Sequence, residues 1–396
     1  LGGCSDFLEV SPVTAPTSES FYNNVEQLEQ AAAAAYTPLQ WKAAYSYDLP
    51  IVLGIITDDE DSPEASRSDV AAYNWQSESF KNNYSVLWMG VARACAVLDN
   101  AADIPANTDA EKKKRDRCVA EAKFLRALYY WHLVSLWGPV PKRTTQAETE
   151  YVKGNATEEE LWALIEQDLS EAVGDTTVGG DPALPAERYN GRAVLASAQS
   201  LYGKVLLHRG KKTEAASMLK KVIDAGDHQL TMLENVFTEE NEHDGENVFS
   251  VEFSNDATIG NGPNPWINDH ANASEGTLRP KFMGPPQGAA WEHSVPTQSL
   301  VDEFEDGDPR KTEFMFTDGD THVDIKDAEG NPGGEWSSDK SKGSIPWGIK
   351  KGLKGPTQKA WPGGFGVNFP LIRYADVLLM RAECLAESDP ATAKQL

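Results

Sequence analysis

The sequence has few basic residues and no long hydrophobic run. Its 36 lysines and arginines face 61 aspartates and glutamates, which gives a formal charge of −25 at pH 7. Nucleic acids and anionic lipid surfaces are bound largely through Lys and Arg, so this charge argues against both as electrostatic partners. No apolar stretch approaches the roughly 20 residues that a membrane-spanning helix requires. The acidity itself has two readings, which are colloidal stability in salt and a part in selecting the ligand.

Cysteines are also few, and the motifs of common enzyme classes are missing. The four cysteines follow neither a CxxC nor a Cys/His spacing, so we expect no zinc site. Cys95, Cys118 and Cys384 fall in helical patterns among Ala, Val and Leu, where a free Cys behaves as a small hydrophobe. G-x-S-x-G, HExxH and P-loop motifs are absent, and acidic runs such as 303–308 predict solvated faces rather than paired catalytic carboxylates. The segment 318–335 lacks the EF-hand spacing for calcium. We therefore expect no enzyme, no metal and no cofactor.

The sequence does contain strong helical periodicity. Hydrophobic residues make up 40% of the chain and aromatic residues 9%, as in a folded globule. Apolar residues recur at helical spacing along the first third, and Gly138-Pro139 stops the strongest run. Thr157 and Glu160 have the spacing of a capping box. These patterns predict helices over 21–40, 86–101, 111–137, 157–173 and 374–387.

The segment Arg192–Ala225 predicts a helix hairpin. Apolar positions at helical spacing precede and follow a turn at Gly210–Lys212, and the unit spans 34 residues, the tetratricopeptide period. Hairpins of this kind cannot bury their apolar faces alone and must stack on neighbours. We therefore expect a mainly α fold of degenerate tetratricopeptide-like repeats.

The segment Ser254–Phe369 has a different composition. Gly and Pro are frequent, helical periodicity fades, and five of the eleven tryptophans lie here. Phe314–Phe316 and Val323–Ile325 predict a short hairpin around Asp318–Asp320. Long loops on a rigid scaffold are where ligand sites usually lie, so we expect this segment to form the ligand face.

The first residues, Leu1-Gly2-Gly3-Cys4, match the end of a bacterial lipoprotein signal, in which the cysteine is acylated. Each buried CH₂ of an acyl chain contributes about 0.8 kcal/mol, so two or three chains on one residue anchor a protein durably. On these four residues alone, an ordinary cysteine at a frayed terminus is an equal alternative.

Several stretches in fixed order resemble landmarks of the SusD/RagB family. A Pro turn leads into an amphipathic helix at Asn368–Glu383, which resembles the family's signature helix. Further stretches resemble its lipidated start, its tryptophan-led helix, its most specific internal stretch and two later landmarks: Cys4–Glu9, Trp88–Asn100, Glu121–Tyr130 with Trp137–Pro141, Gly245–Glu252 and Asp302–Arg310. The resemblance favours lipidation at Cys4.

The resemblance implies one α-rich domain over 1–396. Residues 1–20 would be the tether of the lipid anchor, 21–253 and 370–396 the helical scaffold, and 254–369 the irregular ligand-binding elaboration. The family normally continues well beyond this point, so a C-terminal truncation is expected. The family also implies a protein on the outer surface of the bacterial outer membrane, held by lipid alone. It would capture oligo- or polysaccharide and deliver it to a TonB-dependent (SusC-like) transporter.

Aromatic residues in loops are the candidates for sugar contacts, because rings stack on the apolar faces of sugars while polar groups bind the hydroxyl rim. The alternative for each ring is a place in the core. Trp88, Trp131, Trp137 and Trp162 lie on helical stripes and are expected in the core. The predicted stacking residues are Trp75, Trp266, Trp291 and Trp336, and the predicted hydrogen-bonding residues are Asp69, Asn74 and Asn268.

Two questions remain open from the sequence. The segment Lys340–Ala375 has seven basic residues and no acidic one, which fits either recognition of acidic sugars or, more simply, a solvated strand and loop. The resemblance also leaves a rival function, a tetratricopeptide-like scaffold that binds peptides or proteins, as in the RagB branch. A long groove with few exposed aromatics would favour that rival.

Overall fold

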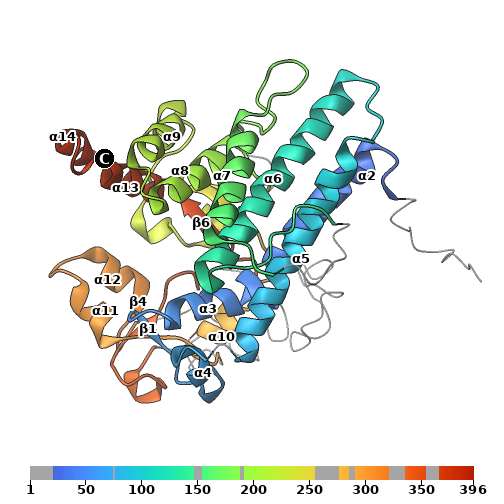
Figure 1. The fold of residues 1–396 in the computed structure, drawn as a ribbon. Coiled ribbons are helices and arrows are strands. Elements are labelled where there is room, and N and C mark those ends of the chain that lie inside the picture. Colours follow the sequence, from blue (N-terminus) through green and yellow to red (C-terminus); the bar gives the residue numbers. More distant parts are fainter. Residues whose placement is uncertain are drawn as a thin grey trace, which may run out of the picture.

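The computed structural model describes residues 21–74, 76–146, 154–187, 191–254, 276–284, 290–320, 335–353 and 365–396. Long helices form one side of the molecule, and most of the short helices and strands form the other (Figure 1). The long helices are α2 (Val25–Gln40), α5 (Glu78–Ala101), α6 (Asp109–Trp137), α7 (Glu158–Gly174), α8 (Leu195–His208), α9 (Lys212–Ala225) and α13 (Tyr374–Leu385). The mainly α fold and its tetratricopeptide-like character are confirmed.

Neighbouring long helices pack in chain order, as expected for helix hairpins. α5 packs on α6, α6 on α7, α8 on α9, and α13 covers α9. Capping boxes begin two of them: the backbone N–H of Thr108 donates to Glu111 at 2.8 Å, and that of Thr157 donates to Glu160 at 2.8 Å. The predicted helices are all present. α5 begins eight residues before its predicted start, because the side chain of Ser77 caps it.

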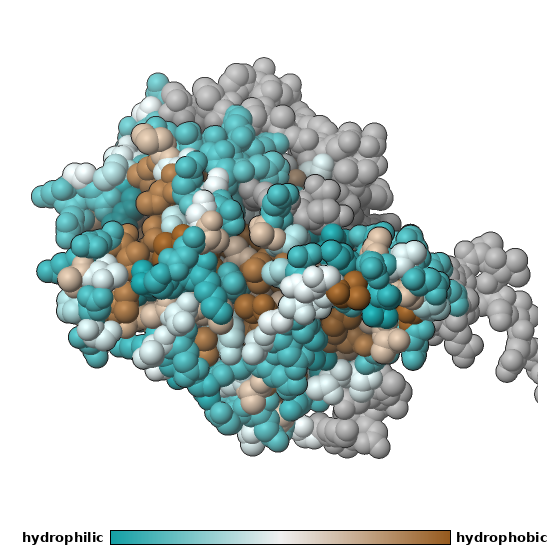
Figure 2. All heavy atoms as spheres, turned by 90° about the horizontal axis from the view of Figure 1, so that it is seen from above, coloured by the Kyte–Doolittle hydropathy of each residue, from teal (hydrophilic) through white to brown (hydrophobic). Residues whose placement is uncertain are grey.

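The main core lies between these helices. Trp162 is buried, and Trp88, Trp131 and Trp137 pack partly buried against the same core, as predicted. Cys95, Cys118 and Cys384 are buried and unpaired, which confirms their role as small hydrophobes. Seen from above, the surface is largely hydrophilic with brown apolar patches between the polar side chains (Figure 2).

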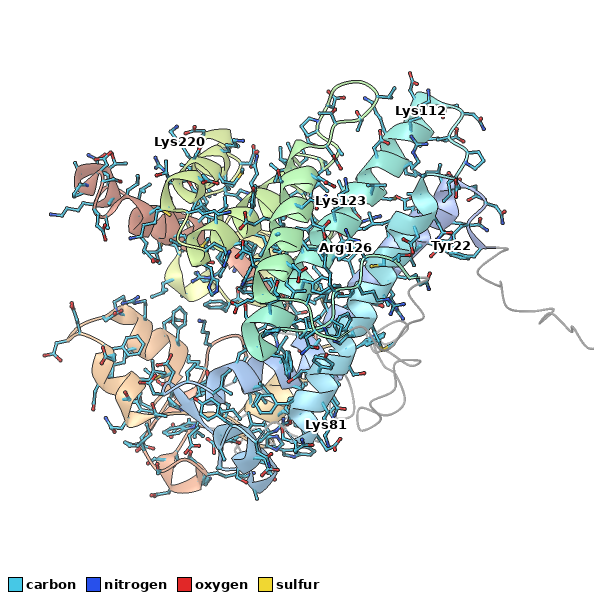
Figure 3. The ribbon with its side chains drawn as sticks, viewed as in Figure 1. Tyr22, Lys81, Lys112, Lys123, Arg126 and Lys220 are labelled. Carbon is cyan, nitrogen blue, oxygen red and sulfur yellow. The ribbon has the colours of Figure 1, made fainter. Side chains whose placement is uncertain are left out.

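Charged side chains also cross the helix layer. Arg126 on α6 forms an ion pair with Asp168 on α7, and Lys123, one turn earlier, lies 2.7 Å from the carboxylate of Asp175 (Figure 3). Glu121 is fully buried and accepts hydrogen bonds from Arg117 and Arg192. These pairs fix α6 against α7 and against the segment that leads into α8.

Strands are short and come in antiparallel pairs. β2 (Asn247–Val251) pairs with β6 (Phe369–Arg373), which joins segments more than 100 residues apart along the chain. β1 (Glu60–Asp61) pairs with β3 (Val295–Pro296), and β4 (Met315–Phe316) with β5 (Gly348–Ile349).

The structure pairs β4 with β5, about thirty residues later along the chain. The other half of the predicted hairpin, Val323–Ile325, lies outside the described residues. The turn at Asp318–Asp320 is present, and the backbone N–H of Trp336 donates to the carbonyl of Asp320 at 2.7 Å. Local turn signals identified the bend but not the distant strand that pairs.

The second side of the molecule is built from short elements. These are α3 (Asp48–Ile55), α4 (Ser68–Ala71), α10 (Arg279–Met283), α11 (Gln298–Glu303) and α12 (Pro309–Phe314), with α14 (Pro390–Ala393) at the far end of the helix layer. In the part of the chain that the structure describes, no helix combines the length and apolarity needed to cross a bilayer.

Candidate functional site: an aromatic face on the short-element side

A separate apolar cluster joins three short elements around one aromatic core. α3, α4 and α10 contribute Ile51, Val52, Val70 and Phe282, and Tyr47 lies at the start of α3. Trp291 packs partly buried against this cluster. We call the surface formed by α3, α4, α10 and residues 291–293 the aromatic face.

Contacts on its inner side fix the ring of Trp291. Phe282 meets it edge-on, with ring centroids 4.7 Å apart and planes at 88°, and Phe282 in turn lies 3.9 Å from the ring of Tyr47. The backbone N–H of Trp291 donates to the carbonyl of Lys281 at 2.9 Å. A ring held in this way and partly open to solvent loses little conformational entropy when a ligand stacks on it.

A polar chain runs behind the rings. Buried Arg67 donates to the hydroxyl of Tyr47 at 2.7 Å and pairs with Asp48, so the Tyr47 hydroxyl donates onward to Nδ1 of His293 at 2.6 Å. Nδ1 is thus the acceptor of a neutral imidazole, and Nε2 faces Glu64 at 3.5 Å. Burial accordingly lowers the pKa of His293 to about 4 and raises the pKa of Tyr47. These hydrogen bonds hold the cluster rigid and keep Tyr47 and His293 neutral at its centre.

A strained backbone position lies between Trp291 and His293. Glu292 has φ of 51°, in the left-handed region that residues with a Cβ rarely adopt. Its buried carboxylate accepts a hydrogen bond from the hydroxyl of Ser341 at 2.9 Å and another from the backbone N–H of Lys342. These bonds compensate for the strain and hold the loop 341–343 beside Trp291.

Cations surround the aromatic rings. The ammonium of Lys281 lies 5.6 Å from the ring of Trp291, that of Lys42 lies 5.9 Å from the ring of Tyr47, and Lys342 donates to the carbonyl of Trp291 at 2.8 Å. Burial lowers the pKa of Lys42 and of Lys281. The face therefore combines apolar rings with hydrogen-bond donors, although the chain as a whole is strongly acidic.

The structure brings three of the predicted site residues onto this cluster. Asp69 and Asn74 are exposed on the α4 segment, which Val70 attaches to the cluster, and Trp291 lies on the other side of it. The backbone N–H of Asn74 donates to the carbonyl of Asp69 at 2.8 Å, which closes this loop.

One predicted stacking residue is excluded. Trp336 is 1% exposed and lies behind β5, where Gly348 makes room for its indole ring, so no face is open to a sugar. Its Gly/Ser neighbours suggested a solvent-exposed loop, but the missing side chain of Gly348 lets the ring enter the core. Four further predicted residues lie outside the described residues: Cys4, Trp75, Trp266 and Asn268.

An exposed aromatic residue beside Asp69 and Asn74 was not predicted. Tyr73 is 54% exposed and has φ of 54°, and its hydroxyl donates to the carbonyl of Ile56 at 2.6 Å. A left-handed tyrosine held by its hydroxyl presents its ring in one orientation. The sequence signal was an aromatic residue between Ala72 and the polar Asn74, in the loop that supplied the predicted Asp69 and Asn74.

The residues described offer no metal centre, since they contain no group of three or more His, Cys, Asp or Glu side chains placed to hold an ion. The aromatic face offers ring faces and hydrogen-bonding groups to a ligand.

Comparisons with known proteins agree with this architecture. The family model described as "Starch-binding associating with outer membrane" matches residues 6–202, and the model of the SusD family matches residues 245–396. The chain is 24% identical over 313 residues to SusD-like protein P25 of Formosa agariphila. The matched region covers 72% of this chain and 57% of that protein. It thus spans little more than half the length of that relative.

Solved structures show the same fold. A laminarin-binding SusD-like protein has a TM-score of 0.73 at 24% identity, over 94% of this chain and 82% of that one. Surface glycan-binding protein A from Bacteroides fluxus has a TM-score of 0.70 at 19% identity, over 92% and 76%. Two models of one family match separate parts that together make up most of the sequence, and the fold agrees with them. The chain belongs to the SusD/RagB family.

Proposed function

We propose that this chain is a glycan-binding protein that captures oligo- or polysaccharide at the aromatic face and catalyses no reaction. The observation that carries the proposal is the placement of Trp291 and Tyr73, two fixed and partly or largely exposed rings, on segments that pack on one cluster. Exposed rings with polar side chains beside them suit the apolar faces and hydroxyl rim of sugars. The names of the laminarin-binding and glycan-binding relatives support this class of ligand.

The proposal includes a cellular setting. The protein would be lipid-anchored through Cys4 on the surface of the outer membrane and would deliver glycan to a TonB-dependent, SusC-like transporter. The family description, which mentions association with the outer membrane, supports this setting. Expression behind a lipoprotein signal peptide in a Bacteroidetes host, with wild type and Cys4→Ala compared, tests the anchor. We expect the wild type in the outer-membrane fraction, and an equal membrane fraction for the variant would refute lipidation at Cys4.

The binding proposal is tested by affinity electrophoresis in native gels. Starch, laminarin, xylan and mannan serve as neutral polymers, and pectin and alginate as anionic ones. Retardation by any of them supports glycan binding, and the anionic arm tests the lysines around the face. Retardation by none, together with binding to peptides, would favour the peptide-binding scaffold instead.

Variants then locate the site by calorimetry with the retarding glycan. A stacking ring contributes about 1–3 kcal/mol, so Trp291→Ala and Tyr73→Ala should each weaken binding roughly tenfold or more, while Trp291→Phe retains most of it. Leu379→Ala is the matched control, because Leu379 is 69% exposed on α13, which is part of the helix layer. Unchanged affinity in both ring variants would move the site away from the aromatic face.

A further inference from the structure

A cavity of about 370 Å³ lies apart from the aromatic face, at the N-terminal end of α8 and beside β2. Val194, Val248 and Phe249 supply apolar wall, and residues of the loops before and after them supply the polar part. None of its lining residues belongs to the cluster around Tyr47 and Trp291. Its volume is within the range of small-molecule sites and suits a ligand of monosaccharide size.

Two buried side chains in its wall have polar atoms without a hydrogen-bond partner in the described part of the chain. These are Oδ1 of Asn247, on a residue 6% exposed, and Oγ of Ser250, on a residue 5% exposed. A buried polar atom that lacks a partner costs about 1–3 kcal/mol. A polar ligand that reaches this wall would recover part of that cost.

The backbone of β2 explains why both residues line one cavity. Side chains three positions apart on a regular strand point to opposite faces. The register of β2 against β6 shifts twice, between Asn247 and Phe249 and again between Phe249 and Ser250. Irregularities of this kind redirect side chains and often lie beside binding sites.

The charge of the lining favours a cation. Four carboxylates line the cavity, from Glu187, Asp227, Asp244 and Glu252. The lining also contains Arg192, but its guanidinium is already engaged, with Nε donating to Glu121 at 2.8 Å. His228 donates through Nδ1 to the carbonyl of Gly245 at 3.0 Å, and Nδ1 of His243 lies 4.0 Å from Oε1 of Glu252. Among the described residues of the lining, the carboxylates therefore outnumber the single arginine.

We propose that this cavity is a second binding site, which takes a small polyhydroxylated ligand with a positive charge, in chemical class an amino sugar. The carboxylates would attract the ammonium of such a ligand, and its hydroxyls would donate to Oδ1 of Asn247 and Oγ of Ser250. The site differs in position and in charge preference from the aromatic face. It does not depend on the glycan bound there.

The test compares D-glucosamine with D-glucose by calorimetry and by saturation-transfer NMR on the whole chain. The two sugars differ at one position, an ammonium in place of a hydroxyl. We expect glucosamine to bind at least roughly tenfold more tightly than glucose, and more weakly at high salt, because the selection is electrostatic. Equal binding of the two sugars, or no binding of glucosamine at millimolar concentration, would overturn the proposal. So would an equal response to cyclohexylamine, which has the charge without the hydroxyls.

Paired variants assign the site. Asp227→Asn with Glu252→Gln removes two lining charges, and we expect a loss of roughly tenfold or more in glucosamine affinity. Asp302→Asn with Glu303→Gln removes the same charge from exposed α11 and should leave the affinity unchanged. If both double variants lose affinity equally, the net charge of the chain attracts the ligand and the cavity is not its site.

Discussion

Arg126 of α6 donates two parallel hydrogen bonds, of 2.8 and 2.7 Å, to the two carboxylate oxygens of Asp168 on α7. Arg126 is 9% exposed and Asp168 is 1% exposed, so the pair is buried in the helix layer. A third bond, from Nη1 of Arg126 to the carbonyl of Thr144, ties the segment after α6 to the same guanidinium. One side chain therefore sets the position of two helices and the segment that follows α6.

This geometry predicts an asymmetry between single and double substitution. Asp168→Leu alone leaves a buried guanidinium without its carboxylate and should lower the free energy of unfolding by about 3–5 kcal/mol. The double variant Arg126→Met, Asp168→Leu removes both charges and should recover much of that loss. Urea denaturation of the two single variants and the double variant measures the coupling energy. A double variant less stable than either single variant would contradict this reading.

Gly90 on α5 provides a second prediction, in which two effects have opposite signs. Ala has a better helix propensity than Gly by about 1 kcal/mol, so Gly90→Ala would stabilise an isolated helix. A Cβ at this position, however, would collide with the ring of Tyr129 on α6, which is itself fully buried. Overpacking in a dense core costs about 1–3 kcal/mol, so we expect net destabilisation.

The control for this prediction is Gly174→Ala. Gly174 is the last residue of α7, and a Cβ there meets nothing within 4 Å. Thermal unfolding should show a lower Tm for Gly90→Ala and little change for Gly174→Ala. A Tm for Gly90→Ala above that of the wild type would mean that α5 and α6 are less tightly packed than described.

His132 predicts how stability depends on pH. It is 4% exposed, and its Nε2 lies 2.6 Å from the hydroxyl of Tyr45, and burial lowers its pKa to about 3. The unfolded chain has a His pKa near 6.5, so between about pH 6.5 and 3 the unfolded state binds the extra proton. Stability from the neutral ring is complete above about pH 6.5 and is lost as the pH falls, on the order of 5 kcal/mol in full.

The measurement compares the unfolding free energy of wild type and His132→Gln at several pH values. Gln keeps a polar partner for Tyr45 but does not titrate. The wild type should lose stability more steeply than the variant below about pH 6. Parallel curves would show that His132 accepts its proton without opening the core.

Glu292 allows backbone strain to be separated from side-chain contacts. Glu292→Ala and Glu292→Gly both remove the carboxylate that binds Ser341 and Lys342, but only Gly adopts φ near 51° freely. The left-handed conformation costs a residue with a Cβ about 1–2 kcal/mol, so the Gly variant should be more stable than the Ala variant by about that amount. Denaturation of both proteins tests this, and equal stabilities would argue against a left-handed residue at this position.

The helical scaffold could be predicted from sequence because its signals are local. Apolar spacing predicted the ends of α6 within a residue or two, and apolar spacing together with one capping box did so for α7. The partner of β4 could not be predicted, because β5 lies about thirty residues away and local patterns hold no information on that pairing. The aromatic face was predicted only in part, since Tyr73 and Glu292 adopt a conformation that their residue types rarely favour. The prediction that Trp336 stacks on a ligand was wrong, because the burial of its ring depends on Gly348, twelve residues later along the chain.

The pairing of β2 with β6 has a consequence for how such a protein can diversify. The strands pair Val251 with Phe369 and thereby hold both ends of the intervening segment at the helix layer. The entropy of closing a loop grows only with the logarithm of its length, so residues inserted or exchanged between these strands add little cost to the scaffold. The two strands therefore keep the ends of this segment at fixed positions, so the segment can change in length and sequence while the helices keep their fold.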